Sequence, residues 1–304
     1  MTERFAGPTT VEAALAILAS DAAARPVAGG TDLVVAARQG RKSLPESIVA
    51  IDRIAGLDHH AVVDGALVLG SLTSHEWIAD SAEVRSTWSA LADASSIVGS
   101  PATRATGTIG GNLMNASPAA DTTAPLVSLG ANVMLRAMGR GSRIVPVASL
   151  ALAPGRTAAA ADELLTTVIV PPPPPGSGSA YIRLEYRRAM EIAVVGAAVL
   201  ITLASNGSIA GAVIALTSVA PTIVRAPEAE AALVGEAANA ATFRVAAEAA
   251  AAAARPIDDV RASADYRRAM LVVVVARTLA AAAARARGES IPIPASRWAP
   301  GREV

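Results

Sequence analysis

Five consecutive prolines, residues 171–175, constrain the fold of this chain more than any other feature. They open the sequence PPPPPGSGS, which runs from Pro171 to Ser179. Proline fixes φ and lacks a backbone N–H group, so this run cannot lie inside a helix or a central strand. Proline-rich and Gly/Ser-rich stretches are typical of linkers. The sequence therefore predicts separate structural units before and after residues 171–179.

The composition excludes several classes of function. Lys plus Arg and Asp plus Glu number 26 each, so no net charge attracts nucleic acid or an acidic membrane. Cysteine is absent, so the chain holds no disulfide and no iron–sulfur or zinc site with thiolate ligands. The three histidines, His59, His60 and His75, are too few for a histidine-rich metal centre. We therefore expect any redox chemistry to come from a bound organic cofactor or from partner chains.

The apolar segments indicate a soluble protein. The N-terminal sequence lacks a basic segment followed by a long apolar core, so we expect no secretory signal. Thr9 followed by Glu12 predicts a capping box at the start of a helix over VEAALAILAS. The late stretch MLVVVVARTLAAAAARARG is interrupted by Arg277 before the ~20 residues that a membrane span needs. It predicts a buried helix that ends near Gly288, and we expect a cytoplasmic protein without a membrane span.

The order of predicted helices and strands along the chain indicates an α+β fold in more than one lobe. The first lobe combines a helix with a buried strand at RPVAGG and a strand at SIVAID. The second lobe has short strands at ALVLGSLTS, NVMLRA, SRIVPV and LLTTVIVP around the helical section SAEVRSTWSALADASSIVGS. We assign four parts: a first lobe (1–57), a second lobe (58–175), a smaller α+β C-terminal domain (176–290) and a C-terminal tail (291–304).

The C-terminal domain is expected to contain a β-hairpin covered by helices. Residues 193–204 and 209–218 are apolar, and the turn sequence SNGS separates them. Alanine-rich helices are predicted near 228–254 and 264–287, and they are expected to pack on the apolar face of the hairpin.

Two glycine pairs each follow an apolar stretch. Gly29 and Gly30 lie in PVAGGTDLVVAARQG, and Gly110 and Gly111 lie in ATGTIGGNLMNASPAAD. Glycine has no Cβ and adopts positive φ readily, so a ligand can approach the backbone and its N–H groups can bind phosphate oxygens. Either pair alone is more typical of an ordinary turn than of a phosphate site, and neither fits the P-loop or Rossmann pattern. Together they predict that two loops from two lobes hold one diphosphate.

These segments resemble the FAD-binding medium subunit of the molybdenum hydroxylases. That family includes xanthine dehydrogenase, aerobic carbon monoxide dehydrogenase and bacterial N-heterocycle dehydrogenases. The resemblance continues in the family's order through LVLGSLTSHEWIADS, DELLTTVIVP, YIRLEYRRAMEIAVVGAAV and VAPTIVRAPEAEAALVGE, and it covers almost the whole chain. It implies a two-lobed FAD-binding domain of the PCMH type, followed by a smaller α+β domain. The flavin would lie between the lobes, and without cysteine near the first loop it is expected to be non-covalent.

The resemblance also assigns cofactor-binding residues. Residues 28–32, with Leu33 behind them, match the first diphosphate loop, and residues 108–112 match the second. Asp121 matches a carboxylate that hydrogen-bonds the cofactor, although it could instead be the N-cap of a helix over TTAPLVSLGA. Arg183 lies where several relatives carry a lysine near the isoalloxazine ring, although it could instead be a solvated arginine. The complete set is Ala28, Gly29, Gly30, Thr31, Asp32, Leu33, Thr108, Ile109, Gly110, Gly111, Asn112, Asp121, Arg183 and Ile192.

Ile192 departs from one branch of the family. The carbon monoxide dehydrogenase type has a tyrosine here, whereas RRAMEIA resembles the xanthine dehydrogenase pattern. The departure implies a less covered flavin face, which is consistent with a dissociable acceptor such as NAD.

The resemblance implies an oxidoreductase subunit of a three-component complex, with no catalytic residue or metal ligand predicted in this chain. A large molybdopterin-binding subunit would oxidise the substrate, and a small [2Fe–2S] subunit would pass electrons on. This chain's FAD would deliver them to NAD, a quinone or another acceptor, in a dimer of heterotrimers. Two alternatives remain, a stand-alone FAD oxidase or reductase and a scaffold without flavin. The low aromatic content of 3% argues against the first, and the two glycine pairs argue against the second.

Overall fold

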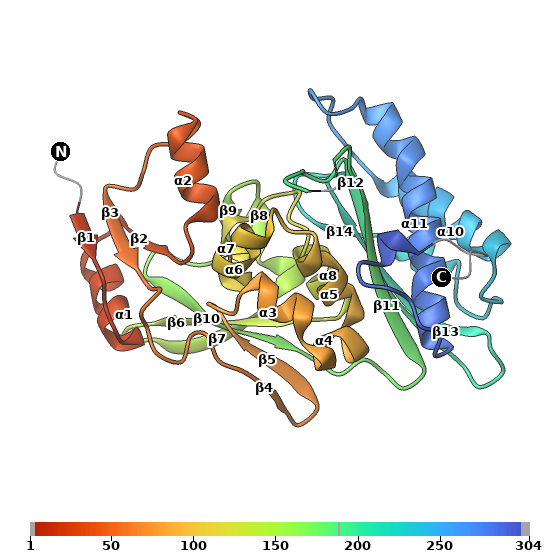
Figure 1. The fold of residues 1–304 in the computed structure, drawn as a ribbon, viewed down its shortest axis with the longest axis horizontal. Helices are drawn as coiled ribbons and strands as arrows, with labels where there is room; N and C mark the ends of the chain where they lie inside the picture. Colours follow the sequence, from red (N-terminus) through yellow and green to blue (C-terminus); the bar gives the residue numbers. More distant parts are fainter. Residues whose placement is uncertain (1–3, 188, 299–304) are drawn as a thin grey trace.

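The computed structural model describes residues 4–187 and 189–298. Its three larger β-sheets follow one another along the long axis of the molecule, from the N-terminal side to the C-terminal side (Figure 1). The α+β class predicted from the sequence is confirmed. The exact domain bounds proposed above stay a prediction, and residues 299–304 of the proposed tail lie outside the described residues.

The N-terminal lobe is a parallel sheet in the order β1-β3-β2. Its elements are β1 (Arg4–Ala6), α1 (Val11–Ser20), β2 (Ala24–Val27), α2 (Thr31–Arg38) and β3 (Ser47–Ala50). Parallel neighbours need such helical crossovers between them. The expected cap at Thr9 is wrong by one residue, because the Thr10 hydroxyl accepts the hydrogen bond from the Ala13 N–H group at 3.2 Å.

The strand at RPVAGG was expected to be buried, and this prediction is wrong. β3 occupies the centre of the sheet, so β2 is an edge strand with an exposed Arg25 and Pro26. Both residues line a cavity described below.

The second lobe is a five-stranded antiparallel sheet in the order β4-β5-β10-β6-β7. The strands are β4 (His60–Val63), β5 (Ala66–Gly70), β6 (Asn132–Ala137), β7 (Gly141–Pro146) and β10 (Glu163–Val170), and a small pair is formed by β8 (Ala151–Ala153) and β9 (Arg156–Thr157). The four strands predicted for this lobe are therefore confirmed. β10 lies at the centre because it pairs with both halves of the lobe.

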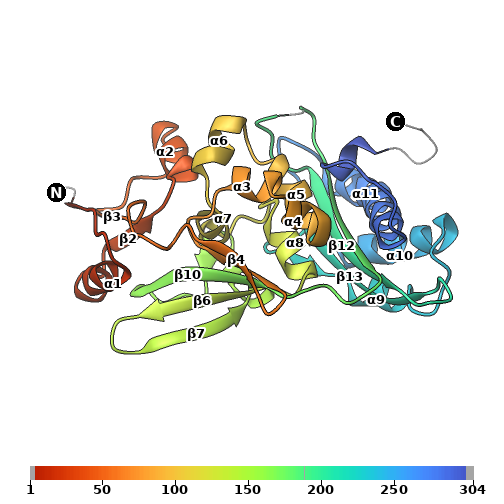
Figure 2. The same cartoon turned by 60° about the horizontal axis from the view of Figure 1, so that its bottom comes forward.

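Six short helices cover one face of this sheet (Figure 2). They are α3 (His75–Asp80), α4 (Ala82–Thr87), α5 (Ser89–Ser96), α6 (Pro101–Thr106), α7 (Ile109–Asn115) and α8 (Thr123–Ser128). The predicted helical section is interrupted at Trp88, which separates α4 from α5. Its indole is fully buried, and Nε1 donates to the carbonyl of Pro171 at 2.9 Å. This contact fixes the start of the proline run to the second lobe.

The C-terminal domain is a four-stranded antiparallel sheet in the order β11-β12-β13-β14. The elements are β11 (Ser177–Leu184), β12 (Val195–Leu203), β13 (Ile209–Thr217), β14 (Val224–Arg225), α9 (Pro227–Ala231), α10 (Ala240–Ala253) and α11 (Ala264–Ala286). The predicted hairpin is confirmed as β12 and β13, with Gly207 at φ +82° in its turn. The linker is shorter than predicted, because β11 already begins at Ser177.

The C-terminal sheet is buried on both faces rather than on one. Ala180 and Ile182 pack with helices α10 and α11, whereas the alternate residue Tyr181 joins the core of the second lobe with Trp88. Because side chains alternate across a strand, β11 contributes to two cores at once. The C-terminal domain and the second lobe thus share an extensive apolar interface.

The predicted helix over 228–254 is divided in two. Gly235 adopts φ +86° after α9, and the Asn239 side chain then caps α10 by accepting from the N–H groups of Ala241 and Thr242. The second predicted helix is confirmed as α11, with Arg287 as its C-cap and Gly288 at φ +82° after it. Glycine in this conformation is the usual end of a helix.

One helix in the described part of the chain, α11, is long and apolar enough to cross a membrane by length and composition. Its apolar side is buried against the C-terminal sheet, where Leu271, Val275 and Leu279 are fully covered. We therefore interpret α11 as the core helix of this domain.

Candidate functional site

The first glycine pair forms the turn from β2 into α2. A Cβ at Gly29 would overlap the carbonyl group of Thr106, so only glycine permits this close approach. Gly30 adopts φ +66° and directly precedes the first helical residue, Thr31. No side chain in the described part of the chain caps α2. The first N–H groups of a helix have no partner within the helix, so this end is suited to bind an anion.

The second glycine pair lies in the first turn of α7 and not in a loop as predicted. The Thr108 hydroxyl caps this helix by accepting from the Gly111 N–H group at 3.1 Å. Ile109 is fully buried in the core of the second lobe. Gly110 is required by packing, since its Cβ would lie 2.6 Å from the Ser71 carbonyl oxygen. Only Gly111 leaves a gap that a ligand can use.

The structure brings the two glycine segments together, as the sequence predicts. A Cβ at Gly111 would lie 3.9 Å from the Cβ of Ala28. Asn115 at the end of α7 donates from Nδ2 to Asp32 Oδ2 at 2.8 Å. Residues far apart in the sequence therefore form two walls of one site.

Two adjoining cavities lie between these walls. One has a volume of about 380 Å³, and its wall includes nine of the predicted residues: Ala28, Gly29, Gly30, Thr31, Asp32, Leu33, Thr108, Gly111 and Asn112. The other has a volume of about 460 Å³ and includes Gly110. Arg25, Ala28 and Gly111 line both, so the cavities form one elongated space.

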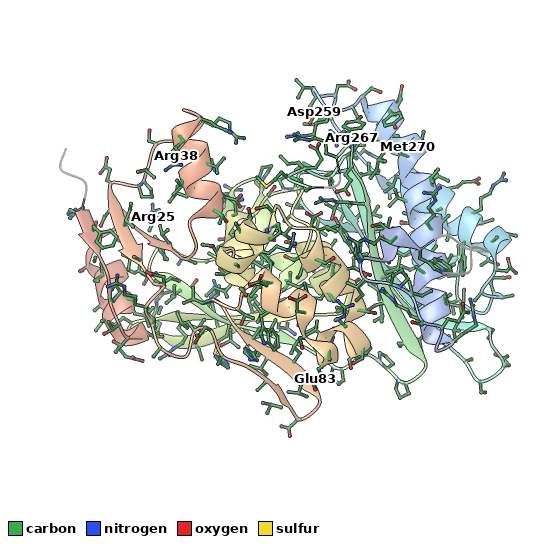
Figure 3. All side chains as sticks on the ribbon, viewed as in Figure 1. Arg25, Arg38, Glu83, Asp259, Arg267 and Met270 are labelled. Atoms are coloured by element: carbon green, nitrogen blue, oxygen red, sulfur yellow. The ribbon has the colours of Figure 1, made fainter. Side chains whose placement is uncertain are left out.

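Cationic side chains line this space. Arg25 on β2, which Figure 3 labels, lines both cavities. Arg156 lines the larger cavity and Lys42 lines the smaller one. Glu163 also lines the larger cavity, but its carboxylate is paired with Arg143 at 2.7 Å. The side chain of Arg143, and hydrogen bonding by it above all, lowers the pKa of Glu163. Asp32 lines the smaller cavity as well, so Arg25, Arg156 and Lys42 face two carboxylates, and the balance of charge still favours an anionic ligand.

The segment 71–75, between β5 and α3, forms a third wall that the sequence analysis did not predict. Ser71 lines the larger cavity and His75 lines the smaller one. An isolated bridge between Ser74 and Thr108 holds the segment beside the second glycine pair. Burial, with a smaller contribution from Arg104, lowers the pKa of His75 to about 4, so its imidazole is neutral at pH 7. Nothing in the sequence pattern alone marks these two residues.

Asp121 and Arg183 contact each other, and neither lines the two glycine cavities. The Arg183 guanidinium donates to Asp121 Oδ2 and to Glu185, and the Tyr181 hydroxyl donates to Asp121 Oδ1 at 2.7 Å. Both alternatives considered above are wrong. Thr122 is the N-cap of α8, and Arg183 is only 5% exposed rather than solvated.

This buried network lies directly behind the smaller cavity. Arg183 Nη2 donates to the carbonyl of Ile97 at 3.1 Å, and the next residue, Val98, lines the cavity. The Thr122 hydroxyl donates to Asn112 Oδ1 at 2.8 Å, and Asn112 also lines the cavity. Burial raises the pKa of Asp121 to about 6, although the Arg183 charge and the Tyr181 hydroxyl oppose the rise.

Ile192 lies apart from the glycine segments. It is 42% exposed and lines a separate cavity of about 330 Å³ together with Asp259 and Arg267. Figure 3 shows Asp259 and Arg267 beside the C-terminal helices, on the opposite side of the molecule from Arg25. The described residues contain no group of three or more His, Cys, Asp or Glu side chains that could hold a metal ion.

Comparisons with known proteins agree with this arrangement. A family model described as "FAD binding domain in molybdopterin dehydrogenase" matches residues 2–173. A second model, "CO dehydrogenase flavoprotein C-terminal domain", matches residues 180–282. The chain is 33% identical to the 6-hydroxypseudooxynicotine dehydrogenase complex subunit alpha of Paenarthrobacter nicotinovorans, over 91% of this chain and 93% of the relative. It is 32% identical to the carbon monoxide dehydrogenase medium chain of Hydrogenophaga pseudoflava, over 92% and 97%.

Solved structures show the same similarity. A chain of carbon monoxide dehydrogenase from Hydrogenophaga pseudoflava superposes with a TM-score of 0.88 at 33% identity, over 94% of this chain and 98% of that chain. Quinoline 2-oxidoreductase from Pseudomonas putida 86 superposes with a TM-score of 0.87 at 26% identity, over 93% and 97%. The resemblance inferred from the glycine pairs is confirmed, and the chain belongs to the FAD-binding medium subunits of the molybdenum hydroxylase family.

Proposed function

We propose that the elongated cavity holds FAD non-covalently and that this FAD passes electrons from [2Fe–2S] clusters of a small partner subunit to an external acceptor. The single observation that carries the proposal is the convergence of the two glycine segments on one cavity. NAD and a quinone are the acceptor classes that we propose. The relatives named above act in complexes, which supports the same role for this chain.

The cavity fits a dinucleotide diphosphate in shape and charge. The uncapped N-terminus of α2 offers N–H groups, and helix N-termini favour negative charge. The missing Cβ at Gly111 leaves room for a phosphate beside the first turn of α7, whose Gly111 N–H group is already bonded to the Thr108 hydroxyl. Arg25 and Arg156 add positive charge along the same space. These groups would hold the diphosphate, and the remaining length of the cavity would take the two ends of FAD.

The Asp121–Arg183 network supports the wall of the smaller cavity, at the end of that cavity that faces the C-terminal domain. Arg183 is held by two carboxylates and by the Ile97 carbonyl, so its position is fixed. The charge of this guanidinium is matched by Asp121 and Glu185, so the network supports the wall through its fixed position rather than through net positive charge. Direct hydrogen bonds from Asp121 or Arg183 to the cofactor, and a role of Ile192 at the flavin face, stay predictions.

FAD, when bound, supplies the redox chemistry, because it exchanges electrons singly or in pairs. The residues of this chain position it, neutralise its diphosphate and leave access for partners. The chain has no cysteine for an iron–sulfur cluster. We therefore propose that the clusters and the molybdenum cofactor belong to a small and a large partner subunit, in a dimer of heterotrimers.

Rapid-mixing absorbance of the purified chain, alone and with both partner subunits, tests this function. With the partners present, the organic substrate should reduce the flavin. Without them, the flavin should stay oxidised on mixing with the same substrate, because the chain holds no molybdenum centre. Flavin that is reduced by the substrate in the isolated chain would replace this proposal with a stand-alone FAD oxidase. Flavin that stays oxidised in the complete complex while the partner clusters are reduced would also contradict it.

A further inference from the structure

Two buried polar atoms in the walls of the elongated cavity lack a hydrogen-bond partner. These are the Oγ atom of Ser71 and the Nδ1 atom of His75, and neither has a partner among residues 4–187 and 189–298. Ser71 is 3% exposed and His75 is 2% exposed. Buried polar groups are nearly always paired, and an unpaired one destabilises the fold. Their position in one cavity therefore indicates that a ligand supplies the missing partners.

The backbone groups of Ser71 and the His75 N–H group are engaged with other partners. The Ser71 N–H group donates to the Thr166 carbonyl at 3.0 Å, and the Ser71 carbonyl accepts from Gly110 at 2.9 Å. The His75 N–H group donates to the Gly107 carbonyl at 3.1 Å. The backbone is thus held rigidly between β10 and the second glycine segment. The Ser71 Oγ and His75 Nδ1 atoms are the buried side-chain atoms of this segment without a partner.

The imidazole of His75 faces the anion-binding end of α2. A Cβ built at Gly107 would lie 3.3 Å from His75 Cδ2 and 3.5 Å from Thr31 Oγ1. The imidazole edge and the first residue of α2 therefore meet at Gly107, which lines the smaller cavity. A half-turn about χ2 exchanges Cδ2 with Nδ1, and the orientation of a histidine ring is set by its hydrogen bonds. A ligand at the α2 N-terminus would favour the orientation in which Nδ1 points toward it.

The hydroxyl of Ser71 lies at the larger cavity, beside the second glycine pair. The hydroxyl proton of serine turns about the Cβ–Oγ bond, and the oxygen can both donate and accept, so it suits a phosphate oxygen or a sugar hydroxyl. FAD carries both kinds of group. The two side chains are four residues apart on one rigid segment, and each lines one of the two adjoining cavities.

We propose that Ser71 and His75 form a third FAD-binding element, which hydrogen-bonds the cofactor in addition to the two glycine segments. The neutral imidazole of His75 and the hydroxyl of Ser71 would add directional hydrogen bonds to FAD. The other walls would contribute charged side chains and backbone N–H groups. This inference rests on the proposed binding of FAD in this cavity.

The test measures the dissociation constant for FAD of the full-length chain after removal of its flavin, by the quenching of flavin fluorescence. Ser71→Ala should raise the dissociation constant about tenfold, the effect of one hydrogen bond to a charged group. The melting temperature of the flavin-free variant should stay the same or rise, because an unpaired buried hydroxyl has been removed. Ser95→Ala is the matched control, since Ser95 Oγ is also buried without a partner but Ser95 lines neither cavity. It should leave the dissociation constant unchanged.

For His75, the informative comparison is between the alanine and the asparagine substitution. His75→Ala should raise the dissociation constant about tenfold or more, and His75→Asn should recover most of the affinity because its amide nitrogen lies near the position of Nδ1. The contribution of the neutral imidazole should be constant between about pH 6 and pH 8. Arg104 is the charged side chain that opposes protonation of this ring. If His75→Ala does not fold, Ser71→Ala and Ser95→Ala decide the question.

Two results would overturn the inference. One is wild-type affinity in both Ser71→Ala and His75→Ala. The other is a loss of affinity that is the same in Ser95→Ala, or that follows a matching loss of melting temperature in the flavin-free chain. Failure of the wild-type chain itself to bind FAD would instead overturn the proposed function.

Discussion

Gly111→Val should abolish FAD binding while the chain still folds. A Cβ at this position meets only the Thr108 side chain at 3.0 Å and Ala28 at 3.9 Å, so the protein can accommodate it with a small shift. The valine methyl groups would enter the cavity and occupy the space that a diphosphate needs to reach the N–H groups at the start of α2. Loss of one or two charged hydrogen bonds costs on the order of 3 kcal/mol, so affinity should fall by about 100-fold or more. Flavin content after purification and fluorescence titration measure the effect.

The neighbouring glycines are controls for this variant. Gly110→Ala should destabilise the chain, because its Cβ would lie 2.6 Å from the Ser71 backbone. A valine at Gly30 would be strained by φ +66° whether or not a ligand binds there, so that variant cannot separate folding from binding. A Gly111→Val protein that is purified with a full complement of FAD would show that this segment does not contact the diphosphate.

Asp93→Ala should lower the free energy of unfolding by about 3–5 kcal/mol, the usual effect of removing one partner of a buried ion pair. Asp93 on α5 is fully buried and forms a two-point ion pair with Arg285 of α11, at 2.7 and 3.0 Å. Its carboxylate also accepts from the backbone N–H groups of Tyr181 and Ala295. One carboxylate thus joins the second lobe to β11 and α11 of the C-terminal domain and to Ala295 in the tail. Denaturant unfolding of the flavin-free chain measures the loss.

An exposed ion pair gives the matched control for Asp93. Glu248 pairs with Arg244 on α10 at 3.1 Å, and both side chains are more than half exposed. Pairs of this kind contribute ~0.5 kcal/mol or less, so Glu248→Ala should unfold almost like the wild type. Equal stability of Asp93→Ala and Glu248→Ala would mean that the Asp93 cluster does not hold the C-terminal domain to the second lobe.

The sequence predicts those parts of the molecule that depend on local patterns. The alternation around β12 and β13 and the turn SNGS predict the hairpin, because period and turn type are local properties. The glycine pairs predict a shared cavity, because a missing Cβ and a positive φ are properties of single residues. Even so, Gly110 serves packing against Ser71 rather than a ligand, and only the tertiary structure reveals that difference.

Long-range contacts account for what the sequence does not predict. Ser71 and His75 become site residues only because the segment 71–75 pairs with the second glycine segment. Tyr181 appears as an ordinary strand residue, yet its hydroxyl contacts Asp121 and its ring fills the core of the second lobe. The edge position of β2 likewise depends on where β3 pairs, which no property of RPVAGG determines.

The flavin content of the purified full-length chain tests the central claim most directly. The chain is precipitated with acid, and flavin is measured in the supernatant and in the pellet, together with iron and molybdenum in the native protein. The account predicts equimolar FAD in the supernatant, no flavin in the pellet and neither metal in the native chain. A colourless chain that does not take up added FAD would contradict it, and flavin that stays with the precipitate would contradict non-covalent binding.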